Sequence, residues 1–337
     1  MGLHGFPSAT SRLCVNSASL FKQFLSRQRS YGGTVKIRYL VLLVAALFFS
    51  TTTVRGQATE AADFAAENAL AHAAYLASAI GERPAGTLGE EQAAGWLAGQ
   101  FAALGYDVRV QPFPFTRLGQ PLVGMNVIAT KPGLVGYGAV YVGAHYDTVG
   151  IAPGFLGGPG AIDNASGVGV MLEGARVAAT AFYTPTLHFI AFGAEEDYLV
   201  GSGHYVAQLS GRDRVGAVGM LNLDCVGWGD EFRLLIARVE DRAFAESLGV
   251  DPDWIGPAGW GASDHISFAN VGIPAAFFNL QRDNLVCGPG YHQQGDTADL
   301  LELPALQRAG DALVTALDTL AAQSTPIHDI YLPLTLR

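Results

Sequence analysis

The amino-acid sequence predicts an α/β protein, a three-layer α/β/α sandwich with a mostly parallel central sheet. Two observations predict this class. Strand-like and helix-like segments alternate along the chain, which is typical of a sheet that carries helices on both faces. Several of the strands are continuous apolar runs, such as AVYVGA at 139–144, rather than alternations of polar and apolar residues. Strands of that kind are buried on both faces, as in parallel sheets.

The expected helices are segments in which apolar residues recur at helical spacing, and glycines mark the ends of the first two. Gly81 stops the first helix and Gly105 follows the second. The expected helices span 60–80, 90–104, 166–181 and 304–322. The expected strands span 106–113, 125–130, 139–144, 186–192, 217–223, 275–279 and, more weakly, 232–237. Neither an internal repeat nor a low-complexity linker interrupts them, so residues 59–323 are expected to form one domain, followed by a tail at 324–337.

Residues 1–58 have the layout of a secretory signal. They contain seven Lys or Arg residues and no Asp or Glu. The apolar stretch at 39–50 follows Lys36 and Arg38 and precedes small residues up to Ala58, a plausible cleavage point. An uncleaved membrane anchor is less favoured, because a spanning helix needs about 20 apolar residues. The segment before Val35 has no periodicity, and Val35 is a possible true start. We expect residues 1–58 to be dispensable and the mature protein to be secreted or periplasmic.

Removal of that segment changes the charge of the protein. It leaves 13 of the 20 Lys and Arg residues against 30 Asp and Glu, and the formal net charge moves from −10 to −17. A protein with this much negative charge repels the phosphate backbone of nucleic acids, so nucleic acid is not expected as a partner. Cys14 is lost with the segment, which leaves Cys225 and Cys287. Export permits a disulfide between them, but buried free cysteines are also common, so both outcomes stay open.

Acidic and histidine side chains follow the predicted strands or lie in the loops beyond them. They are His145, Asp147, Asp163, Glu195, Glu196, Asp224 and His292. Open α/β sheets bind ligands beyond the carboxyl ends of their strands, where these residues fall. Each residue alone has an ordinary structural explanation, but together they predict a metal cluster. Imidazole with carboxylate suits zinc in a hydrolytic site, and two histidines argue against calcium.

Five ordered motifs carry a family resemblance. They are GAHYDT at 143–148, IDNASG at 162–167, GAEE at 193–196, LNLD at 221–224 and YH at 291–292. These motifs resemble those of the M28 family of zinc aminopeptidases. The segments IGERPAG at 80–86 and SDH at 263–265 are similar to recurring family segments. The resemblance covers roughly residues 60–322 and implies the zinc-exopeptidase version of the predicted fold.

The resemblance implies two zinc ions per chain and a ligand set for each. Asp163 would bridge both ions. His145 and Asp224 would complete one site, and Glu196 and His292 would complete the other.

The resemblance also implies roles for three neighbouring side chains. Glu195 would be the general base. Asp147 would hold the His145 imidazole by its second nitrogen. Tyr291 is a candidate donor to the developing oxyanion, although simple packing explains it equally well. The peptide bond between Asp163 and Asn164 would be cis.

The implied activity is hydrolysis of the N-terminal bond of peptides with a free amino terminus, with no membrane association after signal removal. One alternative is a glutaminyl-peptide cyclotransferase with a single zinc, and another is a non-catalytic, receptor-like or binding relative. His145 and the 163–167 stretch favour the two-metal peptidase over the cyclase. A non-catalytic relative is expected to lack ligands, and none is missing. The preferred N-terminal residue and the oligomeric state are not determined by the sequence.

Overall fold

The structure is a computed structural model that describes residues 63–135, 138–150, 157–259 and 261–322. The chain divides into two units, residues 1–58 and 59–337, and all described residues belong to the second. The expected signal segment, its alternative start at Val35 and the tail at 324–337 lie outside the described residues. No helix within the described ranges is long and apolar enough to cross a membrane.

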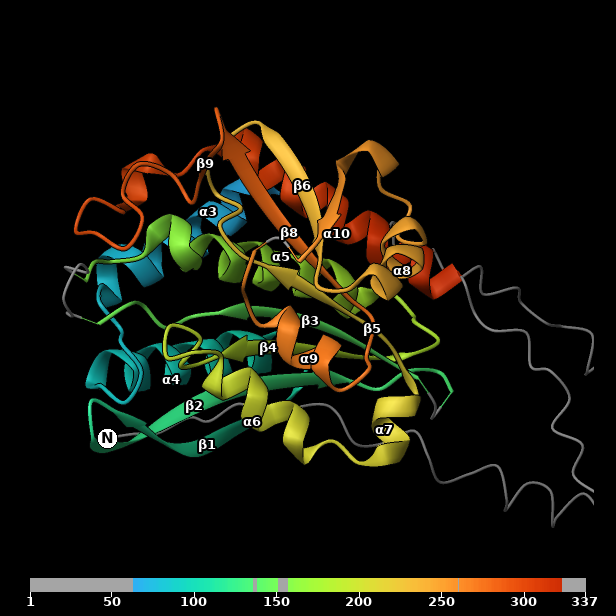
Figure 1. The fold of residues 1–337 in the computed structure, drawn as a ribbon, viewed down its shortest axis with the longest axis horizontal. Helices are drawn as coiled ribbons and strands as arrows, with labels where there is room; N and C mark the ends of the chain where they lie inside the picture. The colour runs from blue at the N-terminus through green and yellow to red at the C-terminus, as the bar shows by residue number, and fades with distance from the viewer. Residues whose placement is uncertain (1–62, 136–137, 151–156, 260, 323–337) are drawn as a thin grey trace, which may run out of the picture. The chain divides into compact units, whose positions relative to one another are not determined.

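One mixed sheet forms the middle layer (Figure 1), in the strand order β1-β2-β4-β3-β5-β8-β6-β7, with β9 beside β8. The strands are β1 (Asp107–Arg117), β2 (Gln120–Lys131), β3 (Ala139–His145), β4 (Thr186–Phe192), β5 (Ala217–Leu223), β6 (Glu231–Ile236), β7 (Ile255–Ala258), β8 (Ala275–Arg282) and β9 (Leu285–Val286). The central strands β4, β3, β5 and β8 pair in parallel. The flanking pairs β1–β2, β2–β4 and β6–β8 are antiparallel. The predicted α/β class is confirmed, with its parallel strands at the centre of the sheet.

The edge hairpin of β1 and β2 is longer than the sequence indicated. Its two-residue turn is Leu118–Gly119, and both residues have positive φ, 49° and 79°, as hairpin turns with the strand-matching twist require. β1 contains Pro112 and Pro114, and it extends past Phe113, where the expected strand ended, although proline cannot donate to a sheet ladder. The structure accommodates them because β1 is an edge strand and pairs only with β2.

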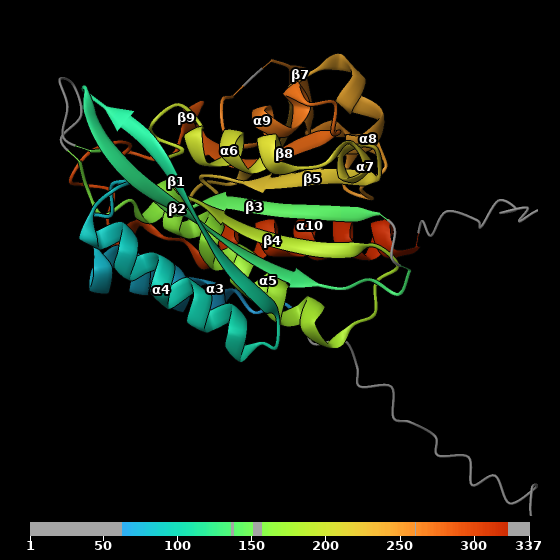
Figure 2. The same cartoon turned by 90° about the horizontal axis from the view of Figure 1, so that it is seen from below.

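Helices cover both faces of the sheet (Figure 2). On one face lie α3 (Ala66–Ala74), α4 (Leu88–Ala103), α5 (Ser166–Thr180) and α10 (Leu303–Ala322), around the larger apolar core. A π-helical turn, Tyr75–Ile80, extends α3 up to Gly81. The other face carries α6 (Val200–Gln208) and α9 (His265–Asn270), around an aromatic core of Tyr141, Phe192, Tyr205 and Phe268.

Several short elements were not predicted from the sequence, among them α6, α7 (Gly211–Val215), α8 (Arg242–Glu246) and α9. In α6, Gly201 and Gly203 lower the helix propensity, and glycine costs about 1 kcal/mol per interior position relative to alanine. The helix is held by tertiary packing instead, because Tyr205 and Val206 are buried in the second core. Local pattern could not show this, since the partner side chains come from β3, β4 and α9.

The parallel strands place the candidate residues at one edge of the sheet. His145 is the last residue of β3, Glu195 and Glu196 follow β4, and Asp224 follows β5. Asp163 lies in the segment Ala161–Ala165 directly before α5, and the backbone of Asp163 and Asn164 is not helical there. His292 follows β8 and β9. The predicted strand ends are therefore the points from which the site is built.

Candidate metal centre

The first group of site residues gathers around His145, which is buried. Its Nε2 lies 3.1 Å from Asp163 Oδ1 and 3.4 Å from Asp224 Oδ1. β3 and β5 are adjacent parallel strands, which is why His145 and Asp224 meet at their ends. The structure thus brings together the three residues predicted for one metal.

The second group contains the same aspartate. His292 Nε2 lies 3.2 Å from Asp163 Oδ2 and 3.3 Å from Glu196 Oε2. Asp163 therefore presents one carboxylate oxygen to each histidine. The Tyr291 ring stacks on the His292 ring with centroids 3.8 Å apart, and Tyr291 is 46% exposed. Its side chain is therefore partly exposed beside the site.

The turn that carries Asp163 is fixed by its neighbours. The Asp163–Asn164 peptide bond is cis, as the resemblance implied. The Asn164 side chain donates to Leu223 O at 2.8 Å and accepts from Gly167 N at 2.9 Å, which ties the end of β5 to the start of α5. The backbone N–H groups of Ile162 and Asp163 donate to the carboxylate of Asp296 at 2.7 and 3.0 Å. Asp296 was not found by the sequence analysis, and its position four residues after His292 is the only signal of it.

Asp147 does more than the sequence analysis expected. Its Oδ1 lies 3.6 Å from His145 Nδ1, an ion-pair distance rather than a hydrogen bond. The carboxylate accepts instead from the backbone N–H groups of Glu195 and Glu196, at 3.1 and 3.3 Å. Asp147 therefore fixes the backbone of the Glu195–Glu196 pair as well as facing the imidazole.

Burial and hydrogen bonds together shift the pKa values of these side chains. It raises the pKa of Glu195 well above its ordinary value and raises the pKa of Glu196 to about 7. Burial lowers the pKa of His292, but hydrogen bonds to Asp163 and Glu196 outweigh it and raise that pKa to about 10. Burial also opposes ionisation of Asp163, yet hydrogen bonds from His145 and His292 hold its pKa below the ordinary value. The clustered carboxylates therefore favour positive charge between them.

The donor set fits divalent cations. In each of the two groups, one ligand atom per residue lies within 4.8 Å of the others. Glu196 Oε1 and Asp224 Oδ1 are buried and have no hydrogen-bond partner within the described part of the chain. Buried carboxylate oxygens without donors are costly, and a cation held between carboxylate and imidazole satisfies them. A third group, His145 with Glu195 and Glu196, places Glu195 within reach of the same centre.

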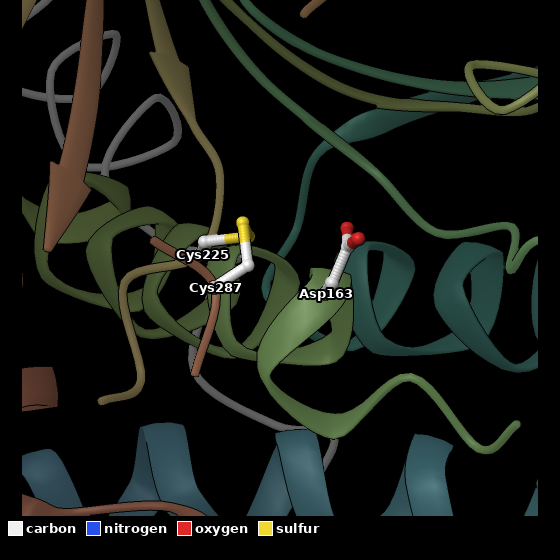
Figure 3. A group of neighbouring side chains, drawn as sticks. All are labelled: Asp163, Cys225 and Cys287. Atoms are coloured by element: carbon white, nitrogen blue, oxygen red, sulfur yellow. A yellow bond between two sulfur atoms is a disulfide. The ribbon is translucent and has the colours of Figure 1, made fainter. Parts of the chain in front are cut away.

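A disulfide lies beside this centre. Cys225 and Cys287 are bonded, and their sulfur atoms lie next to the Asp163 carboxylate (Figure 3). This settles the choice that the sequence left open. Because both sulfurs are in the disulfide, they are not thiolate ligands for a metal. The bond joins the end of β5, where Asp224 lies, to the loop that carries His292.

The sequence profile of peptidase family M28 matches residues 126–317, more than half of the chain and the whole span of the centre. The chain belongs to peptidase family M28. Aminopeptidase YwaD of Bacillus subtilis is 38% identical over 189 residues, which are 52% of this chain and 40% of that protein. The chain spans about half the length of the curated relatives that it matches.

Solved structures share the fold of this family member. The zinc aminopeptidase BSAP of Bacillus subtilis aligns with a TM-score of 0.64 at 25% identity, over 75% of this chain and 94% of that one. The glutaminyl cyclase of Bacteroides thetaiotaomicron aligns with a TM-score of 0.64 at 20% identity, over 76% and 98%. The second likeness shows the fold alone. The predicted zinc-exopeptidase fold is therefore confirmed.

Proposed function

We propose that this M28 protein is a metal-dependent aminopeptidase, an exopeptidase that hydrolyses the N-terminal peptide bond of peptides. One observation carries the proposal. Two groups of ligand side chains share the Asp163 carboxylate, and the partly buried carboxylate of Glu195 lies beside them without belonging to either group. Family membership and the likeness to proteins named as aminopeptidases support it.

The proposed cofactors are two zinc ions, held as the sequence motifs imply. Asp163 would bridge them, His145 and Asp224 would complete one site, and Glu196 and His292 the other. When bound, the ions would acidify a water molecule and polarise the scissile carbonyl.

Glu195 would carry the proton in the reaction. Its carboxylate would accept a proton from the attacking water, whose oxygen adds to the carbonyl carbon. It would then donate that proton to the leaving nitrogen as the C–N bond breaks. Burial raises the pKa of Glu195, which suits a group that must both accept and return a proton. The hydrogen bond from Glu195 N to Asp147 positions the residue for this role.

Tyr291 would donate a hydrogen bond to the oxyanion that forms on the carbonyl oxygen. Burial raises the pKa of Tyr291, so its hydroxyl stays protonated and able to donate. The buried carboxylates around the centre would attract the free amino group of a peptide, because opposite charges interact strongly away from bulk water. Together these features favour cleavage next to a free amino terminus.

The alternative of a single-zinc glutaminyl cyclase has the likeness to a solved cyclase in its favour. His145 weighs against it, because this residue and Asp224 complete a second ligand group around Asp163. A non-catalytic binding relative is less favoured because all five proposed ligands and Glu195 are present.

The test is hydrolysis of a panel of aminoacyl-anilides, free peptides and N-blocked peptides, with and without a chelator. The expected result is cleavage of free amino termini only, lost with chelator and restored by zinc. In Glu195→Gln, kcat should fall by about 10²- to 10⁴-fold. The control is Glu173→Gln, because Glu173 is also a glutamate removed from bulk solvent but accepts from Ala65, Asn68 and Arg176 instead of facing the centre. Its kcat should stay at the wild-type level.

Each outcome bears on a different part of the proposal. Activity that is insensitive to chelator, or full activity in Glu195→Gln, overturns the mechanism. Cleavage of blocked but not free peptides overturns the aminopeptidase assignment. Cyclisation of N-terminal glutamine without hydrolysis, together with one zinc per chain, supports the cyclase instead.

We also propose that residues 1–58 direct export and are removed. The basic residues, the apolar stretch at 39–50 and the small residues up to Ala58 support this. Expression of the full gene with N-terminal sequencing of the product should give a chain that begins at Thr59 outside the cytoplasm. Recovery of residues 1–34 in the mature product rejects both the signal and the start at Val35.

A further inference from the structure

We propose that Arg83 is a positioning residue of the metal centre, which holds together the loops that carry His145 and Asp163. The inference rests on the proposed metal site. Arg83 lies outside the region that the family profile matches, in the IGERPAG segment, and the mechanism above does not use it.

Arg83 is fully buried, and its guanidinium donates to backbone oxygens of three segments. Nε donates to Tyr146 O at 2.5 Å, between His145 and Asp147. Nη1 donates to Pro159 O at 2.5 Å and to Gly81 O at 2.9 Å. Nη2 donates to Gly160 O at 2.9 Å. One side chain thus binds the end of β3, the entry to the Asp163 turn and its own N-terminal segment.

The backbone of Arg83 reinforces the same connection. Its N–H donates to Thr148 Oγ1 at 3.0 Å, and Thr148 N donates to Arg83 O. Gly160 leaves no space for a side chain, since an added Cβ would lie 2.4 Å from Asp163 O and 3.4 Å from Arg83 Nη2. The turn that carries Asp163 therefore sits directly against the guanidinium. Displacement of Arg83 displaces Gly160, and with it the backbone of Asp163.

The Arg83 guanidinium stays charged because carboxylates lie near it. Burial lowers its pKa to about 10, and the carboxylates of Asp147, Asp296 and Asp163 oppose that shift, so the guanidinium stays charged at neutral pH. A buried charge without partners is very costly. The four carbonyl acceptors and the negative charge of these carboxylates offset the cost of burying the Arg83 guanidinium.

Lysine cannot replace this geometry. A guanidinium offers five donors in a planar fork, whereas an ammonium is a compact charge with three. Mutation of residues that orient metal ligands commonly lowers metal affinity by about 10- to 100-fold. Loss of the Arg83 contacts should therefore weaken zinc binding, beyond any loss of stability.

The test compares Arg83→Lys and Arg83→Gln with a matched control, Lys131→Met. Lys131 also donates to three backbone oxygens, those of Ala178, Ala179 and Ala181, but at the far end of α5. Zinc affinity is measured by competition with a chelator on folded protein, and cobalt absorption spectra report the ligand geometry. Urea unfolding in chelator measures stability alone.

The expected result is a loss of stability in every variant but a selective loss of zinc affinity in the Arg83 variants, about 10- to 100-fold, with altered cobalt spectra. Wild-type zinc affinity in folded Arg83 variants, or an equal loss in Lys131→Met, overturns the proposal. A wild-type protein that binds two zinc ions but cleaves no peptide contradicts the proposed function and leaves the role of Arg83 standing.

A second variant decides the matter if the Arg83 variants do not fold. Thr148→Val removes only the hydrogen bond from Arg83 N, at almost unchanged side-chain volume. Zinc affinity should fall by about fivefold, the effect of one hydrogen bond. Unchanged affinity in this variant, with the Arg83 variants unfolded, refutes the positioning role.

Discussion

Reduction of the Cys225–Cys287 disulfide removes a covalent connection between two segments that carry proposed zinc ligands. Cys225 directly follows Asp224, and Cys287 lies five residues before His292. Both cysteines are buried, so the bond is protected from small reductants until the chain opens. The perturbation is to unfold the protein with and without a reductant, in a chelator so that bound metal does not contribute.

The size of the effect follows from the loop that the bond closes. The two cysteines are 62 residues apart in sequence. In the chain-entropy description, closure of a loop of this length stabilises the fold by about 4 kcal/mol, because it restricts the unfolded chain. For a domain of this size, 1 kcal/mol shifts the melting temperature by roughly 2–4 °C, so reduction should lower it by about 8–16 °C.

The assay is urea unfolding followed by circular dichroism, with thiol titration of the unfolded chain. The full chain has three cysteines, so the oxidised form should show one free thiol, that of Cys14, and the reduced form three. The control is Cys225→Ala with Cys287→Ala, in which a reductant should change nothing. Equal unfolding free energies for oxidised and reduced wild type, or three free thiols without reductant, would refute the reasoning.

Three further predictions concern single side chains. Burial lowers the pKa of His265 to about 4, so the unfolded chain binds a proton below pH 6.5 while the fold does not. His265 should therefore contribute a loss of about 3 kcal/mol of unfolding free energy from pH 6.5 to pH 4, and His265→Phe should lack that contribution in urea titrations; parallel pH profiles for variant and wild type contradict it. An added Cβ at Gly201 would lie 2.0 Å from Gly193 O, whereas Gly203 in the same helix has open space. Gly201→Ala should lower the free energy of unfolding by about 1–3 kcal/mol, and it should lower kcat because it moves the backbone before Glu195. Gly203→Ala should change neither quantity. Equal effects of the two substitutions would reject the close packing of Gly201 as the cause. Tyr291→Phe should lower kcat by about 10²- to 10³-fold with little change in KM, and an unchanged kcat would return Tyr291 to a packing role.

Much of the centre could be predicted from sequence because each candidate residue is tied to a strand end. His145 and Asp224 directly follow apolar runs, Glu196 comes four residues after the end of β4, and parallel strands present their carboxyl ends at one edge of the sheet. The bridging position of Asp163 needed the family resemblance, because its turn has no regular pattern. Its two oxygens facing two histidines are visible only in three dimensions.

Asp296 and Arg83 could not be recognised from pattern alone. An isolated aspartate in a polar loop, or an arginine before a proline, looks like a solvated side chain. Their importance comes from burial and from backbone groups far away in sequence, such as Ile162 for Asp296 and Tyr146 for Arg83. The same holds for α6, whose glycines hide a helix that only tertiary packing stabilises.

The sequence itself determined the cluster of carboxylates and histidines at the edge of the sheet. Apolar runs decide where strands end, and the residue types that follow decide which ions those ends can hold. Only the tertiary structure decided how the cluster is supported: by the disulfide at Cys225, by Asp147 across the Glu195–Glu196 backbone, and by Arg83 beneath the loops. The physical reason is that hydrogen bonds and ion pairs depend on which distant groups are brought within about 3 Å, and local sequence carries no record of those partners.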